Sequence, residues 1–385
     1  MADARRILAS PKLPASPCHQ KTERLPEIRI HTMRAAVLQG KSISIRQMPD
    51  PSPASGQLLV RPIFTGICGS DLSARKQMAA MAATLPPEAQ SQMPAIIPGH
   101  EFSAEVVGIA PGTDTQIRTG DIITGLPFTH THEGPQTIGL SPGHGGGLAE
   151  LSCIDACRSF RIPEGVPHDL AALTEPLSVG LHAANLASRN RAPNVVIGCG
   201  PVGLAVILSL SLQGRGPILA ADFSAERRRA ASALGADIVI DPASASAFDH
   251  WSDLSLTPHP MSPLLERDFR GLPPGANIFE CTGAPGMIDQ VIKGAPPHSH
   301  IIVAGVCPHE EKLTPLDGIL RELTLEFSFA YRPEEFAAAL AMIQAHPDKA
   351  ARLITSRQPL ANTEAAFDSL AKSPSEIKIL IDPNS

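Results

Sequence analysis

The chain contains a glycine-rich turn of the kind that binds dinucleotides. The turn follows an apolar run at 195–197, opens a predicted helix, and reads Gly198-Cys199-Gly200-Pro201-Val202-Gly203. In a GxGxxG turn the first glycine permits the tight turn, the second lets the backbone approach a pyrophosphate, and the third lets helix and strand pack closely. The N–H groups that begin the helix then bind the phosphates. Taken alone, the pattern also fits a glycine-rich turn without a ligand.

An acidic residue strengthens the cofactor interpretation. Asp222 stands nineteen residues beyond Gly203, at the end of the next predicted strand. A carboxylate there can accept hydrogen bonds from both hydroxyls of an adenosine ribose and repels a 2′-phosphate, so it predicts NAD rather than NADP. Arg227 is placed to flank the adenine, although the three arginines at 227–229 equally fit a solvated helix face.

Three residues upstream have side chains that bind metals. Cys68 stands in the segment GICGSD, His100 in PGHEF and Glu175 in TEPL. Singly, they fit a buried thiol, a core histidine and a carboxylate that caps a helix. Next to a dinucleotide fold, the three supply sulfur, nitrogen and oxygen ligands and leave a fourth position open, which is how a catalytic Zn²⁺ site is built.

With these residues the sequence resembles the zinc-dependent medium-chain dehydrogenases, in the branch of polyol, butanediol and threonine dehydrogenases. The resemblance covers residues 33–385 in consistent order. It implies an α/β subunit in which a GroES-like β-barrel catalytic domain joins a Rossmann domain with a doubly wound parallel sheet, with the active site in the cleft between them. Besides the segments above, the motifs that carry it are Gly-Asp at 120–121, EPLSVGLHA at 175–183, ECTG at 280–283, VAGV at 303–306 and ELTL at 322–325.

The resemblance assigns a role to each candidate residue of the metal site. It implies that Cys68, His100 and Glu175 hold a catalytic zinc ion. Glu101 matches a carboxylate that can orient or transiently replace a ligand. Ser70 matches the hydroxyl that joins the substrate oxygen to a proton relay.

The expected reaction is hydride transfer between a secondary alcohol or polyol and NAD. Binding to Zn²⁺ lowers the pKa of a hydroxyl group, so an alcohol can lose its proton near neutral pH, with Ser70 passing the proton onward. The hydride then moves to a nicotinamide ring held at attack distance. The resemblance places Gly305 and Val306 beside the cofactor. The expected partner is a small alcohol or ketone substrate.

Three departures from the family pattern limit what carries over. Residues 122–150 contain no cysteine, so the structural zinc of many relatives is expected to be absent, with one zinc per chain. Ser73 stands where relatives often have a relay histidine, and nothing in the sequence says what replaces it. The span from Cys68 to His100 is longer than usual, and residues 77–83 within the 72–98 insertion predict an added apolar helical turn. Loop residues between 122 and 150 also offer a weak alternative metal cluster or mobile histidines, namely His130, His132, Glu133 and His144.

Two patterns along the chain must position these residues. Short alternating apolar runs at 34–38, 58–62 and 104–108 predict a β-rich, barrel-like module. From about residue 186, strands and helices alternate, which predicts a parallel sheet with helices on both faces. The expected strands are 194–197, 218–221, 238–240, 277–280, 300–306 and 323–330, and the expected helices are 201–213, 225–234 and 333–343.

The expected domains follow from the same change of pattern. Residues 1–32 are expected to be a disordered extension, 33–185 the GroES-like catalytic domain and 186–331 the Rossmann NAD-binding domain. Residues 332–385 are expected to return to the catalytic domain, and 243–274, rich in proline and serine, to be a weakly structured elaboration.

Composition excludes several classes of function. The 385 residues suffice for two or three domains, and a net charge of −6 with one Trp and one Tyr gives no electrostatic footprint for nucleic acid or anionic lipid. Glycines and prolines interrupt the longest uncharged stretch, 195–213, so no membrane span is expected. Seven scattered cysteines argue against a disulfide framework and for a reducing compartment, so a cytoplasmic location is expected.

Two other functions remain open on the sequence. One is a non-catalytic nucleotide-binding protein on the same fold, suggested by Ser73 and the 72–98 insertion. The other is a zinc-free reductase of activated double bonds, although such proteins usually lack Cys68, His100 and Glu175. The resemblance implies a homodimer or homotetramer. Which alcohol is the substrate cannot be read from the sequence.

Overall fold

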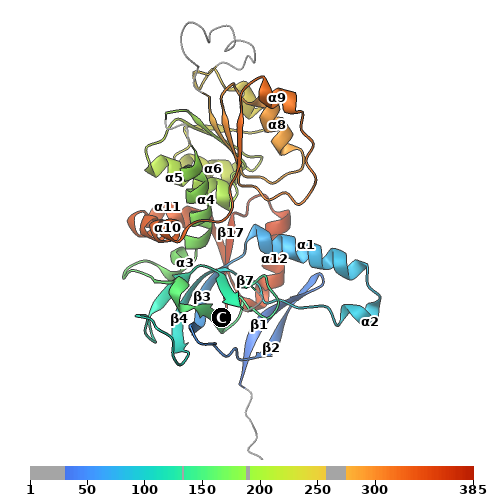
Figure 1. Cartoon of the computed structure of the whole chain (residues 1–385), viewed down its shortest axis with the longest axis vertical. Coiled ribbons are helices and arrows are strands. Elements are labelled where there is room, and N and C mark those ends of the chain that lie inside the picture. The colour runs from blue at the N-terminus through green and yellow to red at the C-terminus, as the bar shows by residue number, and fades with distance from the viewer. Residues whose placement is uncertain (1–30, 132–133, 188–190, 257–274) are drawn as a thin grey trace, which may run out of the picture. The chain divides into compact units, whose positions relative to one another are not determined.

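A six-stranded parallel sheet carries the glycine-rich turn. The computed structural model describes residues 31–131, 134–187, 191–256 and 275–385, of which those from Thr32 onward belong to one unit (Figure 1). The strand order of the parallel sheet is β12 (Ile238–Ile240), β11 (Ile218–Ala221), β10 (Asn194–Ile197), β13 (Asn277–Glu280), β14 (His300–Val303) and β15 (Thr324–Phe327). The order reverses beside β10, so the turn after β10 lies at the switch point where ligands bind to such sheets.

Apolar cores on both faces explain why these strands read as continuous hydrophobic runs. Every residue of β10, β11, β13 and β14 is buried. Successive side chains point to opposite faces of a strand, so Val196 packs into one core and Val195 into a second core that contains Trp251. The sequence pattern therefore predicted both the strands and their burial.

Helices pack against this sheet and against one another. They are α4 (Thr174–Leu186), α5 (Pro201–Leu212), α6 (Ala225–Leu234), α8 (Met287–Gly294), α9 (Pro315–Ile319) and α10 (Pro333–Ala345). α4 contacts both α5 and α10. A Cβ atom on Gly180 of α4 would lie 2.3 Å from the Cβ atom of Ala205 of α5, so the glycine permits this close helix packing. In the part of the chain that the structure describes, no helix has the length and apolar character needed to cross a bilayer.

A second, mixed sheet forms the barrel-like module. Its order is β16 (Ile354–Pro359), β17 (Lys378–Asp382), β3 (Gln57–Gly66), β4 (Glu101–Ile109), β5 (Ile122–Gly125) and β9 (Ser159–Arg161), with β8 (Ser152–Asp155) also paired to β3. Two hairpins accompany it, β1 (Thr32–Gln39) with β2 (Ser42–Pro49) and β6 (Phe128–Thr131) with β7 (Gly134–Thr137). β17 pairs antiparallel with β3, so the C-terminal strand lies within the first module.

The insertion before His100 folds as helices. Its main element is α1 (Gly69–Ala83), which continues without a break through the expected added turn at 77–83 and is followed by α2 (Pro87–Gln90). The remaining short helices are α3 (His168–Ala171) and α11 (Pro347–Ala350).

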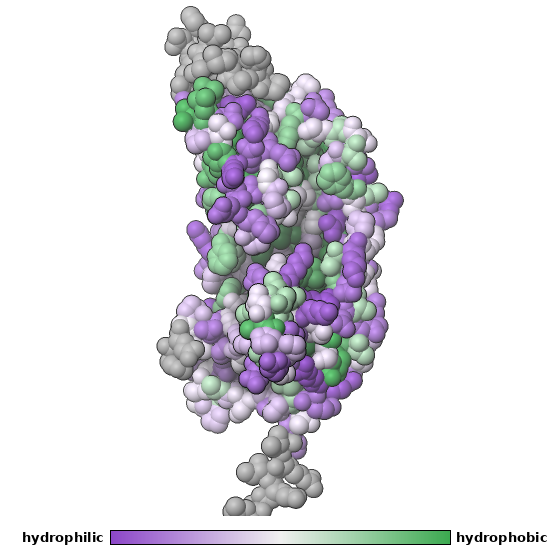
Figure 2. All heavy atoms as spheres, turned by 90° about the vertical axis from the view of Figure 1, so that its right-hand side faces the viewer, coloured by the Kyte–Doolittle hydropathy of each residue, from purple (hydrophilic) through white to green (hydrophobic). Residues whose placement is uncertain are grey.

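The face of the molecule on the right-hand side of Figure 1 is hollowed at mid-height, with hydrophobic residues in the hollow (Figure 2).

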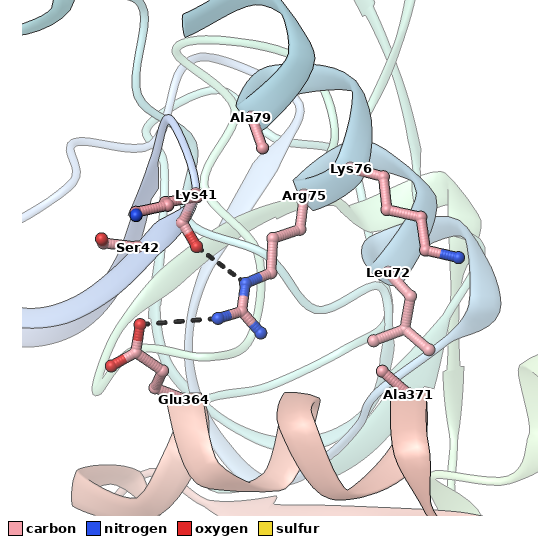
Figure 3. Close-up of a pocket in the computed structure, with 8 residues that line it drawn as sticks. All are labelled: Lys41, Ser42, Leu72, Arg75, Lys76, Ala79, Glu364 and Ala371. Atoms are coloured by element: carbon pink, nitrogen blue, oxygen red, sulfur yellow. Dashed lines mark hydrogen bonds and ion pairs between the residues drawn. The ribbon is translucent and has the colours of Figure 1, made fainter. Parts of the chain in front are cut away.

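Arg75 connects α1 to the C-terminal part of the chain. Its Nε donates to the carbonyl of Lys41 at 2.8 Å, and its Nη1 donates to Asp368 at 2.7 Å in α12 (Thr363–Lys372). Arg75 and Lys41 line a cavity of about 310 Å³ between α1 and α12, together with Glu364 of α12 (Figure 3). Because α12 leads into β17, this contact joins the two segments that supply residues to the site described below.

Two strands end earlier than the sequence suggests. The expected strands 300–306 and 323–330 are only His300–Val303 and Thr324–Phe327. The N–H groups of residues 304 and 305 both bond to the carbonyl of Glu280, which turns the chain across the end of β13. Ala330 has φ of 53°, outside the range of a strand. Of the expected elaboration 243–274, residues 257–274 lie outside the described part, as do His132 and Glu133.

Two glycines of the dinucleotide turn should respond differently to alanine. A Cβ on Gly203 would lie 1.9 Å from the carbonyl oxygen of Gly198, so Gly203→Ala should lower the free energy of unfolding by about 1–3 kcal/mol. A Cβ on Gly200 would meet nothing within 4 Å, so Gly200→Ala is the matched control and should keep the wild-type melting temperature. Thermal unfolding of both variants tests this. Equal melting temperatures for the two would contradict the packing argument.

Candidate metal and cofactor site

Three side chains of types that can bind a metal meet at the N-terminal end of α1. The ligand atoms of Cys68, His100 and Glu101 all lie within 4.8 Å of one another. Cys68 is the N-cap residue of α1, and Glu101 begins β4. Gly99, at φ of 102°, turns the chain just before His100, and a Cβ there would lie 2.9 Å from the backbone nitrogen of Leu148. The local chain path therefore requires glycine next to His100.

Asp71 and Ser70 flank the His100 imidazole. The Nδ1 atom of His100 is 3.5 Å from Oδ1 of Asp71, and the Nε2 atom is 3.3 Å from Oγ of Ser70. Asp71 also accepts a hydrogen bond from the backbone N–H of Cys68 at 2.9 Å. Burial lowers the pKa of His100, but the charges of Asp71 and Cys68 outweigh it and raise that pKa well above its usual value. Asp71 thus holds the loop that carries Cys68 and places a carboxylate oxygen beside the imidazole of His100.

A buried ion pair lies behind the cluster. The Lys378 ammonium donates to both carboxylate oxygens of Glu101, at 2.7 and 2.6 Å, and to the carbonyl of Ile67 at 2.9 Å. Burial alone would lower the pKa of Lys378, but Glu101 and Cys68 raise it, so the ammonium stays charged. The positive charge of Lys378 thereby compensates the negative charge of Glu101 without a metal.

Glu175 lies next to the cluster and has its own partner. It is in the first turn of α4, and its Oε1 accepts a hydrogen bond from the hydroxyl of Tyr331 at 2.9 Å. Burial, with the nearby charge of Glu101, raises the pKa of Glu175 to about 7 against the opposing effect of His100. Glu175 does not belong to the group whose ligand atoms lie within 4.8 Å of one another.

The donor set fits a zinc ion. A thiol sulfur, an imidazole nitrogen and carboxylate oxygens are the ligands that zinc takes in catalytic sites. Asp71, on the far nitrogen of the imidazole, matches the carboxylate that orients a metal-bound histidine. The chain therefore has both the ligands and the groups that hold them.

The glycine-rich turn has the shape that a dinucleotide needs. Gly198 has φ of 91°, and Gly203 packs directly on the Gly198 carbonyl. The space beside Gly200 is open, so its backbone can approach a pyrophosphate. α5 begins at Pro201, with its first N–H groups at this turn.

Asp222 lies directly under the turn. Its Oδ2 accepts from the backbone N–H of Cys199 at 2.8 Å, and its Oδ1 accepts from that of Ser224 at 2.7 Å. The Arg227 guanidinium instead donates to the carbonyl of Glu376, at 2.9 Å from Nη2. Val306 is 83% exposed, and Gly305 lies against Gly283 across the turn.

Asp71, Lys378 and Tyr331 are the residues that the sequence interpretation missed. Asp71 had a signal, because it follows Ser70 in the quoted segment GICGSD and can cap the helix that begins there. Lys378 and Tyr331 contact residues 277 and 156 positions away. No pattern near either residue points to those contacts.

The chain matches two family models and a known dehydrogenase. Residues 54–164 match the alcohol dehydrogenase GroES-like domain, and residues 201–345 match the zinc-binding dehydrogenase model. The (R,R)-butanediol dehydrogenase of Bacillus subtilis strain 168 is 30% identical over 359 residues, covering 89% of this chain and 97% of that protein. This chain belongs to the zinc-binding, medium-chain alcohol dehydrogenase family.

Other proteins similar to this medium-chain dehydrogenase are dehydrogenases as well. The crystal structure of 2R,3R-butanediol dehydrogenase from Bacillus subtilis has a TM-score of 0.74 at 28% identity, covering 91% of this chain and 100% of that one. The sorbitol dehydrogenase of Rattus norvegicus is 26% identical, covering 89% and 94% of the two chains. A zinc-binding dehydrogenase from Sinorhizobium meliloti 1021, solved bound to NADP, shares the fold, with a TM-score of 0.75 at 24% identity over 92% and 100% of the two chains.

These findings confirm the predicted fold class and enzyme class. The chain is a zinc-dependent oxidoreductase of the alcohol dehydrogenase type that uses a nicotinamide cofactor. The alternative of a non-catalytic nucleotide-binding protein loses its support, because the named relatives are dehydrogenases.

Removing Lys378 should destabilise the metal-free protein strongly. Lys378→Met leaves the Glu101 carboxylate buried without a partner, which costs about 3–5 kcal/mol in the free energy of unfolding. Adding Glu101→Gln to that variant should recover most of the loss. Urea unfolding of chelator-treated protein measures both effects.

The control is the exposed pair of Lys372 with Asp368, in which the Lys372 side chain is 75% exposed. Lys372→Met should leave the unfolding midpoint almost unchanged. If Lys378→Met were as stable as Lys372→Met, the buried pair would not have the assigned importance.

Proposed function

We propose that this dehydrogenase transfers a hydride between a secondary alcohol or polyol and NAD. The proposal rests on two features of the same chain. Cys68 and His100 lie close to acidic side chains, and the glycine-rich turn has the Asp222 carboxylate bonded to its backbone. Similarity to butanediol and sorbitol dehydrogenases supports a substrate with adjacent hydroxyl or carbonyl groups.

The proposed metal ligands are Cys68, His100 and Glu175, with Glu101 as the carboxylate that can orient or replace a ligand. The zinc ion, when bound, acts as a Lewis acid that makes an alcohol proton easier to remove. Asp71 lies 3.5 Å from the imidazole on the Nδ1 side, and Lys378 holds both carboxylate oxygens of Glu101 in place. Ser70, 3.3 Å from His100, is the proposed acceptor of the substrate proton and passes it toward solvent. Ser73 lies within α1, at the position where relatives often have a relay histidine.

The proposed cofactor site is built on Gly198, Gly200, Pro201, Val202 and Gly203 at the pyrophosphate. Asp222 is the proposed acceptor for the ribose hydroxyls. The fixed position of its carboxylate, held by the N–H groups of Cys199 and Ser224, supports this role. Gly305 and Val306 are the proposed contacts near the nicotinamide end. Arg227 is proposed to flank the adenine through its aliphatic stem, since its guanidinium is bonded to Glu376.

The proposed domains have the boundaries expected from the sequence. Residues 33–185 and 332–385 form the catalytic domain, and 186–331 form the cofactor domain. One zinc per chain is proposed, because the cysteine-free segment 122–150 contributes the hairpin β6–β7 in place of a four-cysteine lobe.

A second copy of the chain is the proposed protein partner. β15 is an edge strand of the parallel sheet, and large apolar side chains are exposed on it and near it. Phe327 is 66% exposed, Phe329 87% and Ile319 69%. An apolar sheet edge of this kind needs cover. A homodimer formed through this edge supplies it.

Activity should depend on zinc held by Cys68. Reduction of NAD by a panel of polyols, vicinal diols, amino alcohols and simple secondary alcohols, run with and without chelator, should identify a substrate class and show loss of activity on chelation. Cys68→Ala should bind no zinc and lose at least 10²-fold in kcat/KM. Cys153→Ala, in β8, is the matched control and should keep both. A Cys68→Ala protein with undiminished alcohol oxidation would refute the proposed metal site.

Cofactor choice should depend on Asp222. Wild-type enzyme is expected to have the higher kcat/KM with NAD. Asp222→Ser should lower kcat/KM for NAD about ten- to hundredfold, because charge-assisted hydrogen bonds of about 1.5–3 kcal/mol are lost, and should raise it for NADP. Initial rates with both cofactors measure the ratio. A wild-type preference for NADP would overturn the assignment.

A further inference from the structure

Tyr331 is the one side chain that bonds to Glu175 in the described part of the chain. It lies between β15 and α10, directly after Ala330 with its left-handed φ of 53°. Its hydroxyl donates to Oε1 of Glu175 at 2.9 Å. Glu175 Oε2 accepts no hydrogen bond from the residues that the structure describes, so it is the oxygen open to a metal ion or a water molecule.

The ring of Tyr331 packs at the end of a row of three aromatic rings. Its centroid is 5.6 Å from that of Phe336 in α10, and Phe336 is in turn 5.2 Å from Phe160 of β9. The neighbouring backbone N–H of Arg332 donates to Glu335 at 2.8 Å, which caps α10. The hydroxyl therefore occupies a position fixed by packing and by a helix cap.

A second contact ties the two helices together near this bond. Glu335 of α10 accepts from Asn185 of α4 at 2.9 Å and lies 2.8 Å from Nδ1 of His182 of α4. Glu175 belongs to α4, and Tyr331 lies two residues before the start of α10. The contacts of Glu335 thus hold α4 and α10 together, and the hydrogen bond from Tyr331 to Glu175 joins the same two parts of the chain.

Electrostatics explain why Glu175 needs a donor. It is a buried carboxylate close to Glu101, and the repulsion between the two is opposed by the charges of His100 and Lys378. The Lys378 ammonium, however, bonds to both oxygens of Glu101 and not to Glu175. Tyr331 is the hydrogen-bond donor to Glu175 among the described residues, so its hydroxyl fixes the position of Oε1.

We propose that Tyr331 is a positioning residue of the zinc site, whose hydroxyl holds Oε1 of Glu175 and presents Oε2 to the metal. The inference rests on the proposed function, in which Glu175 is a zinc ligand. The hydroxyl does not touch the metal itself in this role. The same hydrogen bond links the metal side of the molecule to the end of the cofactor-binding sheet, because Tyr331 follows β15.

The first test measures zinc affinity by competition with a chromogenic chelator. Tyr331→Phe keeps the ring and removes only the hydroxyl, and should weaken zinc binding about ten- to hundredfold, as loss of a ligand's hydrogen-bond partner does. Ser178→Ala, which removes a buried hydroxyl bond one turn along α4, is the matched control and should stay within about twofold of wild type. Cobalt-substituted Tyr331→Phe should also show a shifted visible absorption spectrum. Equal zinc affinity and an equal spectrum in Tyr331→Phe and wild type would overturn the proposal.

The second test uses the wild-type chain, so it does not depend on a variant that folds. Tyr331 is the only tyrosine of the 385 residues, so 3-fluorotyrosine labelling gives a single ¹⁹F resonance. Zinc added to the metal-free protein should move that resonance, and Glu175→Gln should abolish the movement. A resonance that does not move while zinc binds would overturn the role of Tyr331 and leave the proposed metal site standing. A wild-type chain that binds no zinc would overturn both.

Discussion

The buried ion pair between Glu101 and Lys378 is the interaction on which the rest of the metal site depends. The two side chains are 0% and 1% exposed, and neither charge is stable there without the other. The Lys378 ammonium also holds the carbonyl of Ile67, the residue before Cys68. The pairing of the C-terminal strand β17 with β3 places Lys378 where it bonds to both Glu101 and the residue before Cys68.

Around this pair, each negative group of the site has a partner of its own. Glu101 has Lys378, Glu175 has the Tyr331 hydroxyl, and Asp71 has the backbone N–H of Cys68 and the His100 imidazole. The acidic groups can thus lie close together without a bound cation and still be held in defined positions. A zinc ion supplies a positive charge, which these negatively charged side chains favour. Preorganisation of this kind keeps the site ready for the metal and for a substrate oxygen.

Local sequence was enough to predict those features that arise from local structure. The strands Asn194–Ile197 and Ile218–Ala221 and the turn after Gly198 follow from apolar runs and from glycines, and the structure has them with those bounds. The meeting of Cys68 with His100 came from a resemblance in residue types, and the structure brings them together. Lys378 and Tyr331 were missed because their partners are far away in the sequence and because a single lysine or tyrosine carries no signal of its own. The end of β14 was missed for a similar reason, since its turn is set by contact with Glu280 and Gly283.

Anomalous diffraction at the zinc absorption edge, from crystals of the zinc-loaded enzyme, locates the metal. We expect one anomalous peak per chain, next to the Cys68 sulfur, the His100 imidazole and a carboxylate oxygen of Glu175 or Glu101, with Lys378 still bonded to Glu101. A strong peak elsewhere, for example beside His130 or His144, with none at Cys68 and His100, would contradict it.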